Sequence, residues 1–353
     1  MKAIERGSRL RRRQARSLTD RFADLQVEAV IAERLARLPP RVQRRLSRRP
    51  PIIVDGQRLE ADVQLMLALR SLLGEPVWDE TLDVETARRL TRKETATAAG
   101  RRRIPVGGVE ELTVAGLRAR RYICAEPDPK PTLLYLHGGG FVVGDLDTHD
   151  APCRVLCRHA GVDVVSVEYR KAPEHPFPGY VDDARRAFEW AAERYDRVAV
   201  GGDSAGGNLA ATLAIEYDPV LALLIYPAVD ATRERPSHKL FGEGFFLTDA
   251  LMEWYTGHFL PDDADRADPL RSPLLSPRLH ESSPALIITA GFDPLRDEGE
   301  AYGEALREAG VPVMAHRFRG LFHGFINSVG ASPSSRAALI ETAGMTRALL
   351  RSR

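Results

Sequence analysis

The distribution of hydrophobic residues changes at about Val109. From there on, short runs rich in β-branched residues alternate with amphipathic stretches of helical length. The runs predict eight strands, at Glu110–Val114, Leu117–Cys124, Thr132–Leu136, Val162–Tyr169, Arg197–Gly201, Leu221–Tyr226, Ala285–Ala290 and Val311–Phe318. Helices are expected between most of them, at 149–160, 180–195, 205–217 and 296–309. After a first hairpin around Gly116, this alternation indicates a mostly parallel sheet covered by helices on both faces.

Two regions interrupt this alternation. Residues 1–105 are polar and helical in pattern, with a second helix expected over Glu60–Leu73, and their first apolar positions recur at helical spacing at Phe22, Leu25, Val30, Ile31, Leu35 and Leu38. Region 228–283 contains a helix expected at Asp249–Leu260 and a Pro-rich return. Both regions are too long for simple connections. We therefore expect a helical cap with a basic N-terminal segment over 1–105, and a main α/β domain over 106–353 with a cap insertion around 228–283.

Charge is distributed unevenly along the chain. The formal net charge is +1, yet residues 1–49 hold 15 Lys and Arg against 5 Asp and Glu. This excess is interpreted as an amphipathic helix and a solvated tail, with weak association to an anionic surface kept open. Phe22 is the one aromatic residue among these arginines, which argues against base stacking and nucleic-acid binding.

Cysteine content and hydropathy bear on the compartment. Cys124, Cys153 and Cys157 are too few for a disulfide framework and fit a reducing environment. No stretch approaches the roughly 20 apolar residues of a membrane span. A cytoplasmic location is expected.

The first candidate for chemistry is Gly202-Asp203-Ser204-Ala205-Gly206, which has the form G-x-S-x-G. It follows the strand at Arg197–Gly201 and opens the helix at 205–217. A serine on such a sharp strand-to-helix turn points its hydroxyl away from the sheet, and the helix start favours developing negative charge. Ser204 is the candidate nucleophile.

A second candidate follows the strand Thr132–Leu136, in His137-Gly138-Gly139-Gly140-Phe141. Three successive glycines allow backbone N–H groups to approach a substrate closely, as stabilisation of a tetrahedral oxyanion requires. A phosphate-binding loop is disfavoured, because neither the lysine of a G-K-[ST] motif nor the spacing of G-x-G-x-x-G is present. His137 is expected to anchor this loop by hydrogen bonding rather than to act as a base.

A serine hydroxyl needs a base and an orienting acid. His323 follows the last predicted strand, and Asp293 follows the one before it. Both therefore leave the carboxyl ends of parallel strands, at the edge where Ser204 emerges. The alternative for Asp293 is a helix N-cap, and Asp297 is the fallback acid.

Cys153, Cys157 and His159 could be drawn as a metal site. Their spacing and the lack of a fourth ligand favour ordinary helix packing, so neither a metal nor a cofactor is expected.

Together these motifs resemble the bacterial hormone-sensitive-lipase-like (family IV) carboxylesterases of the α/β-hydrolase superfamily. The resemblance covers roughly residues 38–330 and is carried by His137–Phe141, Gly202–Gly207, the run from Asp293 to Gly299, His323-Gly324-Phe325 and the run from Tyr169 to Pro178. The chain departs from the family at Lys171, where leucine is more usual. Pro51–Gln57 and the helix after it are similar to the cap of actinobacterial members.

The resemblance implies an α/β-hydrolase fold and hydrolysis of short- to medium-chain acyl esters through an acyl-enzyme. Ser204 would be the nucleophile, His323 the general base and Asp293 its orienting acid. The oxyanion hole would use the N–H groups of Gly139, Gly140 and Ala205, with Gly138 shaping the turn. The substrate would be a small ester, and a homodimer through a sheet edge is an expectation from the family.

Three other functions stay open at this point. The same triad could cleave amides, because specificity depends on pocket walls that the sequence does not reveal. A non-catalytic binding module on this fold would typically lack the histidine, which is present here. The Arg-rich beginning could add an anchoring role.

Overall fold

A computed structural model describes residues 30–31, 33–73, 81–127, 130–232, 235–260 and 265–352. The arginine-rich beginning, and with it the start of the helix predicted from Phe22, lies outside these residues.

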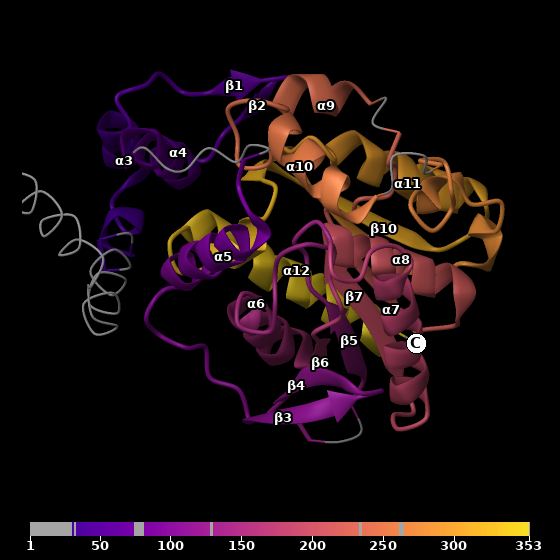
Figure 1. Cartoon of the computed structure of the whole chain (residues 1–353). Helices are drawn as coiled ribbons and strands as arrows, with labels where there is room; N and C mark the ends of the chain where they lie inside the picture. Colours follow the sequence, from indigo (N-terminus) through magenta and orange to yellow (C-terminus); the bar gives the residue numbers. More distant parts are fainter. Residues whose placement is uncertain are drawn as a thin grey trace, which may run out of the picture.

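The core of the described chain is the predicted eight-stranded sheet (Figure 1). Its strands lie in the order β10-β9-β8-β7-β5-β6-β4-β3. The six from β6 to β10 on one side run parallel, whereas β4 pairs antiparallel with both β3 and β6. The strands are β3 (Gly108–Val114), β4 (Leu117–Ile123), β5 (Thr132–Leu136), β6 (Asp163–Val167), β7 (Val198–Asp203), β8 (Ala222–Ile225), β9 (Ala285–Phe292) and β10 (Val313–Phe322). The predictions of an α/β-hydrolase fold and of a mostly parallel sheet are confirmed.

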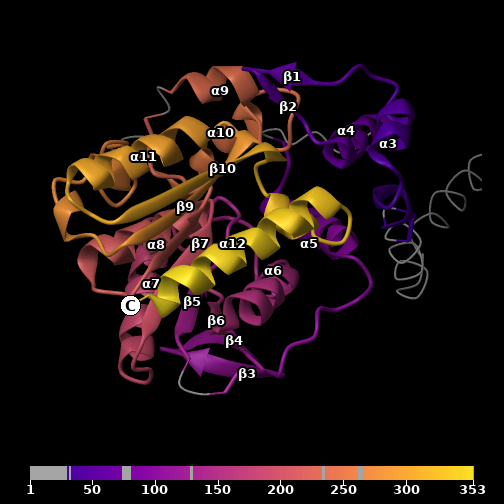
Figure 2. The same cartoon turned by 180° about the vertical axis from the view of Figure 1, so that it is seen from behind.

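Helices cover both faces of the sheet, as Figures 1 and 2 show from opposite sides. Alternate residues of one strand enter different cores: Leu133 and Tyr135 pack in one, Leu134 and Leu136 in the other. This period of two is the reason the buried strands are apolar throughout. The first core is closed by α6 (Asp150–Leu156), a π-helical turn (Cys157–Gly161) and α12 (Pro333–Arg351), and the second by α7 (Gly179–Ala192), α8 (Ala205–Glu216) and α11 (Arg296–Glu308).

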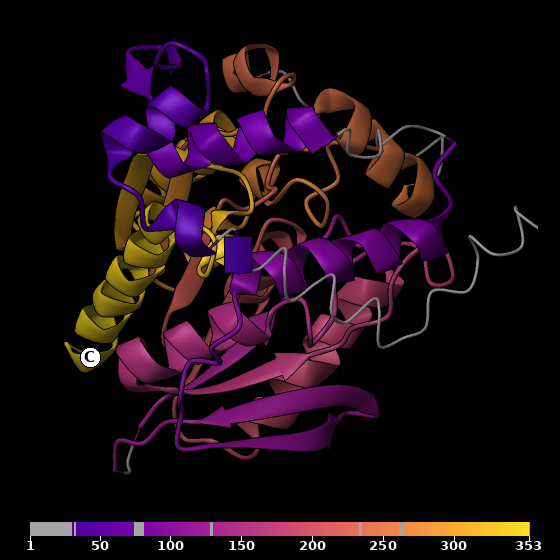
Figure 3. The same cartoon turned by 90° about the vertical axis from the view of Figure 1, so that its left-hand side faces the viewer.

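A further group of elements lies on the side of the molecule away from β3 and β4 (Figure 3). The predicted helices at 60–73 and 249–260 are present here as α4 and α10. The group consists of α3 (Pro40–Leu46), β1 (Ile53–Val54), β2 (Gln57–Arg58), α4 (Ala61–Leu73), α5 (Val84–Ala99), α9 (Pro236–Phe241) and α10 (Asp249–Phe259). Trp254 of α10 donates its indole N–H to Leu82 O just before α5, at 2.9 Å, so the two helices are joined directly.

Several elements of the described chain were not predicted from the sequence: the helices α3, α5, α9 and α12 and the short strands β1 and β2. Helix α5 begins at an N-cap, where Asp83 accepts a hydrogen bond from the Thr86 N–H. In the described part of the chain, no helix combines the length and the apolarity that crossing a membrane requires.

Candidate active site

Ser204 sits on a tight turn between β7 and α8. Its backbone has φ +55°, a conformation rarely adopted by residues other than glycine. The turn requires glycine at its flanks: a Cβ on Gly206 would lie 1.9 Å from Leu136 O, and one on Gly202 would lie 2.3 Å from Gly206 O. These close approaches explain why the serine is bracketed by glycines, and they fix its side chain at the end of the sheet.

The structure brings Ser204, His323 and Asp293 into one hydrogen-bonded chain. His323 Nε2 lies 2.9 Å from Ser204 Oγ, and His323 Nδ1 lies 2.9 Å from Asp293 Oδ2. Asp293 is fully buried, and its other oxygen accepts the Leu295 N–H at 2.8 Å. A carboxylate only accepts, so the proton of neutral His323 resides on Nδ1 and the lone pair of Nε2 faces the serine hydroxyl.

The fallback acid, Asp297, is held elsewhere. Its two oxygens accept from Arg296 Nε at 2.7 Å and from the Ser237 N–H at 2.8 Å. Asp293 accepts the Leu295 N–H, but it is not the N-cap of α11, because that position belongs to Leu295 and no described side chain caps the helix. The geometry thus selects Asp293 as the partner of the histidine.

The glycine loop after β5 has an unusual backbone. Gly139, Gly140 and Phe141 have φ angles of +122°, +57° and +61°. A Cβ on Gly140 would lie 2.3 Å from the ring of Tyr255, so α10 packs directly on this glycine. Among the described residues, no hydrogen bond occupies the N–H of Gly139 or Gly140. Both glycines line the same pocket as Ser204 and Ala205. The amide of Ala205 is the first of α8, where backbone donors lack helical partners.

The loop is tied to the nucleophile turn through Asp203. Its Oδ1 accepts from the Gly138 N–H at 2.9 Å and from Tyr135 Oη at 2.8 Å, and His149 Nε2 lies 3.2 Å away. Burial by itself would raise the pKa of Asp203, but His149 and these donors hold it below its usual value. The role of Asp203 in tying the loop to the nucleophile turn was not predicted from the sequence, and no role was assigned to His149. The two residues lie 54 positions apart in the chain, and no local motif links them.

His137 lies beneath the loop and is completely buried. Its Nδ1 is 2.9 Å from Gly138 O, its carbonyl accepts from Tyr169 Oη at 2.7 Å, and the Tyr169 ring stacks on the imidazole at 4.3 Å. Burial, with Lys171 nearby, lowers the pKa of His137 to about 3. The imidazole is therefore neutral at physiological pH.

The pocket in front of Ser204 has a volume of about 250 Å³ and a mainly apolar wall. Phe141 stacks on Tyr180 at 4.2 Å and meets the edge of Phe259 at 5.0 Å. Helices α5 and α10 contribute Thr91, Thr95, Leu251, Met252 and Tyr255 to the wall. Such a lining suits an apolar group attached to a polar reacting centre.

The cysteines do not form a ligand cluster. Cys124, Cys153 and Cys157 are buried free thiols, and burial raises the pKa of Cys157 to about 12. Within the described ranges, no group of three or more His, Cys, Asp or Glu side chains is arranged to hold a metal ion.

Comparison with known proteins extends these observations. A family model described as alpha/beta hydrolase fold matches residues 133–327. The carboxylic ester hydrolase LipN of Mycobacterium tuberculosis is 41% identical over 336 residues, which cover 89% of this chain and 89% of LipN. The ethyl acetate hydrolase of Pseudomonas putida is 39% identical over 289 residues, which cover 76% of this chain and 91% of that enzyme.

Solved structures agree with these sequence matches. An α/β-hydrolase enzyme from the metagenome of Lake Arreo, Spain, aligns with a TM-score of 0.78 and 37% identity, covering 82% of this chain and 98% of that one. The hyperthermophilic esterase of the archaeon Pyrobaculum calidifontis aligns with a TM-score of 0.73 and 38% identity, covering 79% and 97%. The similarity extends over most of the chain and is not confined to single motifs.

Proposed function

Because the chain belongs to the hormone-sensitive-lipase-like (family IV) carboxylic ester hydrolases of the α/β-hydrolase superfamily, we propose that Ser204, His323 and Asp293 carry out its ester hydrolysis. The observation that supports these roles is the continuous chain of 2.9 Å contacts from the serine hydroxyl through the imidazole to a buried carboxylate. The strained backbone at Ser204, a residue that lines the pocket, supports its role as nucleophile.

The reaction proceeds in two acyl-transfer steps. His323 Nε2 takes the hydroxyl proton as Ser204 Oγ attacks the ester carbonyl, and the imidazolium then protonates the departing alcohol. Water enters next, loses a proton to His323 and attacks the acyl-serine, releasing a carboxylic acid and restoring the hydroxyl. Asp293 keeps the imidazole in the tautomer that both steps need and stabilises its charged form.

The negative charge of each tetrahedral intermediate is stabilised by backbone donors. We assign this role to the N–H groups of Gly139, Gly140 and Ala205, which border the pocket beside Ser204. One such donor typically contributes about 3–4 kcal/mol to lowering the barrier. Gly138 and His137 support the loop from below.

We propose short- to medium-chain acyl esters as substrates. The pocket volume of about 250 Å³ and the covering helices α5 and α10 leave limited space for an acyl chain. In this proposal, residues 1–105 together with part of 228–283 act as a cap over a catalytic domain formed by 106–353. We also propose a reducing, cytoplasmic environment, which the three buried free thiols support. A homodimer is proposed from the resemblance to the family alone.

The test is hydrolysis of p-nitrophenyl esters from acetyl to palmitoyl by the wild-type protein and by Ser204→Ala. We expect maximal turnover at short or medium chains, which disappears in the variant while the fold is retained. A maximum at long chains would refute the size limit but not the mechanism. Turnover of Ser204→Ala near the wild-type rate would refute the role of the serine. A parallel series of p-nitroanilides tests whether amides are preferred instead.

A further inference from the structure

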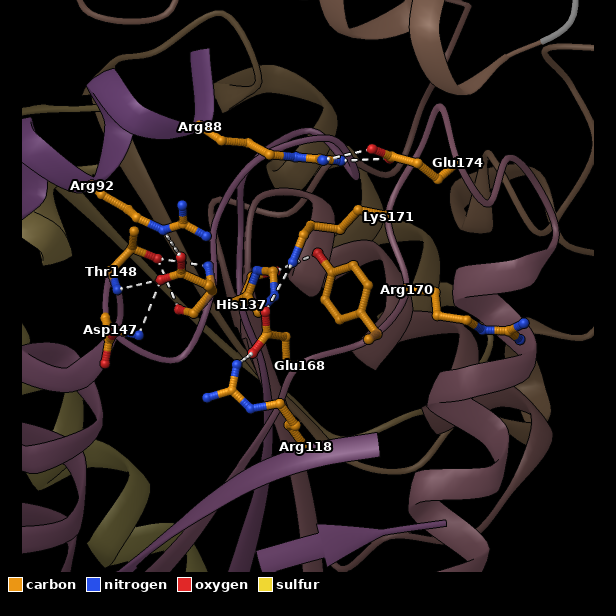
Figure 4. A network of polar contacts seen from close by, with 12 residues as sticks. Arg88, Arg92, Arg118, His137, Asp147, Thr148, Glu168, Arg170, Lys171 and Glu174 are labelled. Carbon is orange, nitrogen blue, oxygen red and sulfur yellow. Dashed lines mark hydrogen bonds and ion pairs between the residues drawn. The ribbon is translucent and has the colours of Figure 1, made fainter. Parts of the chain in front are cut away.

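Helix α5 is attached to the glycine loop by an arginine whose donors reach four acceptor atoms on three residues. Arg88 Nε donates to Val142 O and Nη2 donates to Ala172 O, both at 2.9 Å. Nη1 and Nη2 also bind the two oxygens of Glu174 at 2.7 Å each. Figure 4 shows the side chain extending from α5 across to Glu174. One guanidinium thus links α5 to two segments that lie 54 and 84 residues away in the chain.

The loop that Arg88 holds contains three successive residues with positive φ. Such a backbone is strained, above all at Phe141, and persists only where the surroundings impose it. Its front end is fixed by the Gly138 N–H on Asp203. Its far end is fixed where the Ala172 N–H donates to Phe141 O and where Arg88 binds Val142 O. Val142 N and Val143 N both donate to Gly139 O, so a shift of Val142 is transmitted directly to Gly139.

Arg88 also connects two segments that are hydrogen-bonded to each other, the end of the glycine loop and the segment around Ala172. Phe141 O accepts from the Ala172 N–H, while Arg88 binds the carbonyl of Ala172 and that of Val142. A planar guanidinium with five donors can satisfy such divergent acceptors together, whereas a lysine ammonium on its flexible stem cannot.

Other contacts support the same end of α5. Ala87 is fully buried in a cluster with Val142, Val143 and Ala172. Arg92, one turn further along (Figure 4), forms an ion pair with Asp145. The Asp145 carboxylate accepts the Thr148 N–H, and the Asp145 N–H donates to the Thr148 hydroxyl group. The helix therefore forms part of the frame of the loop as well as a wall of the pocket.

We infer that Arg88 is a positioning residue for the oxyanion hole. Through its bonds to Val142 O and Ala172 O, it couples the position of α5 to the orientation of the Gly139 and Gly140 N–H groups. The inference rests on the proposed ester hydrolysis. The ion pair with Glu174 is the lesser part of this coupling, because Glu174 is 55% exposed while the Arg88 side chain is 21% exposed. The two carbonyl contacts are the part that acts on the loop.

The experiment compares Arg88→Lys with Arg89→Lys and Glu174→Gln. Arg89 is a matched control, since it is the exposed next residue of the same helix and, among the described residues, its guanidinium donates to the Thr86 hydroxyl group alone. We expect Arg88→Lys to lower kcat on p-nitrophenyl butyrate roughly 10- to 100-fold with KM within twofold of wild type. Both control variants should stay within about twofold of wild-type kcat.

A transition-state analogue separates positioning from general damage. An alkyl trifluoromethyl ketone adds to the serine and places an oxyanion where the donors lie, so its Ki should rise in Arg88→Lys by the factor that kcat falls. Added guanidinium chloride, compared with equal sodium chloride, should partly restore kcat in Arg88→Ala.

Several results would overturn the inference. They are an unchanged kcat in Arg88→Lys, an unchanged Ki for the ketone, or an equal loss in Glu174→Gln. Failure of both Arg88 variants to fold would likewise make the residue structural. A wild-type protein inactive on all esters refutes the proposed function instead, so the two failures are distinguishable.

Discussion

Replacing Asp293 by Asn tests the hydrogen-bonded chain at its buried end. The substitution keeps the shape of the side chain and removes its charge. In the wild type, Oδ2 accepts from His323 and Oδ1 accepts from the Leu295 N–H. An Asn in the same place can keep the bond to Leu295 through its oxygen, but its NH₂ group then faces His323 Nδ1.

This orientation reverses the histidine tautomer. With a donor opposite Nδ1, the imidazole proton moves to Nε2, and Nε2 can no longer accept the proton of Ser204. Turning the amide over would restore the tautomer, but it would set the NH₂ group against the Leu295 N–H. Because the site is fully buried, such an unsatisfied donor costs about 1–3 kcal/mol, a factor of roughly 5 to 150 in the active population. Loss of the charge that stabilises the imidazolium adds to this, so we expect kcat to fall roughly 10⁴-fold, about 5.4 kcal/mol in barrier.

The assay is release of p-nitrophenol from a butyrate ester, with circular dichroism to show that the variant is folded. Asp297→Asn is the control, because Asp297 binds Arg296 and Ser237 and makes no contact with the histidine. Its kcat should remain near wild type. The reasoning is refuted if Asp293→Asn keeps more than about a tenth of the activity, or if Asp297→Asn loses as much as Asp293→Asn.

Two further predictions concern the glycine loop and the histidine beneath it. Gly140→Ala should lower kcat at least 100-fold, because its Cβ would lie 2.3 Å from the Tyr255 ring. Gly116→Ala is the control: Gly116 has a positive φ with open space around it, so this substitution should lower stability and leave kcat unchanged. Equal losses of activity in the two variants would contradict this reasoning. Between pH 6.5 and about 3 an unfolded chain protonates His137 while the folded one does not, because burial and Lys171 lower its pKa to about 3. The unfolded state then binds more protons, so the free energy of unfolding falls as the pH is lowered, by about 1.6 kcal/mol from this residue between pH 6.5 and 5. Urea unfolding at both pH values should show this loss in the wild type and a smaller one in His137→Gln, and an equal loss would exclude His137 as its source.

The sheet and the placement of Ser204, Asp293 and His323 could be predicted because both depend on local signals. Buried parallel strands are apolar on both faces, so they appear as distinct runs in the sequence. The three side chains follow such runs directly, and the carboxyl ends of parallel strands meet at one edge. Boundaries were less accurate: β10 extends to Phe322, four residues past the predicted end, because the sequence between Phe318 and Phe322 is interrupted by arginine and glycine.

Helix α5 could not be recognised in this way. Of its sixteen residues only Ala87 is fully buried, and its pocket side carries Thr91 and Thr95, so few large apolar residues mark it in the sequence. Its attachment depends on Arg88 binding backbone carbonyls far along the chain, and a carbonyl has no sequence signature. Cap residues did offer a signal for both helices: Asp83 caps α5, and Ser332 caps α12, where Pro333 occupies the first turn.

The strained residues of the site share the same limitation. Ser204, Phe141 and Tyr226 all have positive φ without being glycine. Ser204 belongs to the hydrogen-bonded chain, Tyr226 lies against His323, and Phe141 lines the same pocket. Each is held by a contact distant in sequence: Ser204 by its N–H on Ile225 O, Phe141 by its stack on Tyr180, and Tyr226 by its ring against His323. Such conformations cost of order 1–3 kcal/mol each and are maintained by the packing around them. The glycines of the two motifs therefore indicate where the backbone bends sharply, but the positions where packing forces an ordinary residue into that conformation follow only from the folded structure. At this site those positions are Ser204, which is the nucleophile, Phe141 at the end of the glycine loop, and Tyr226, whose ring lies against His323.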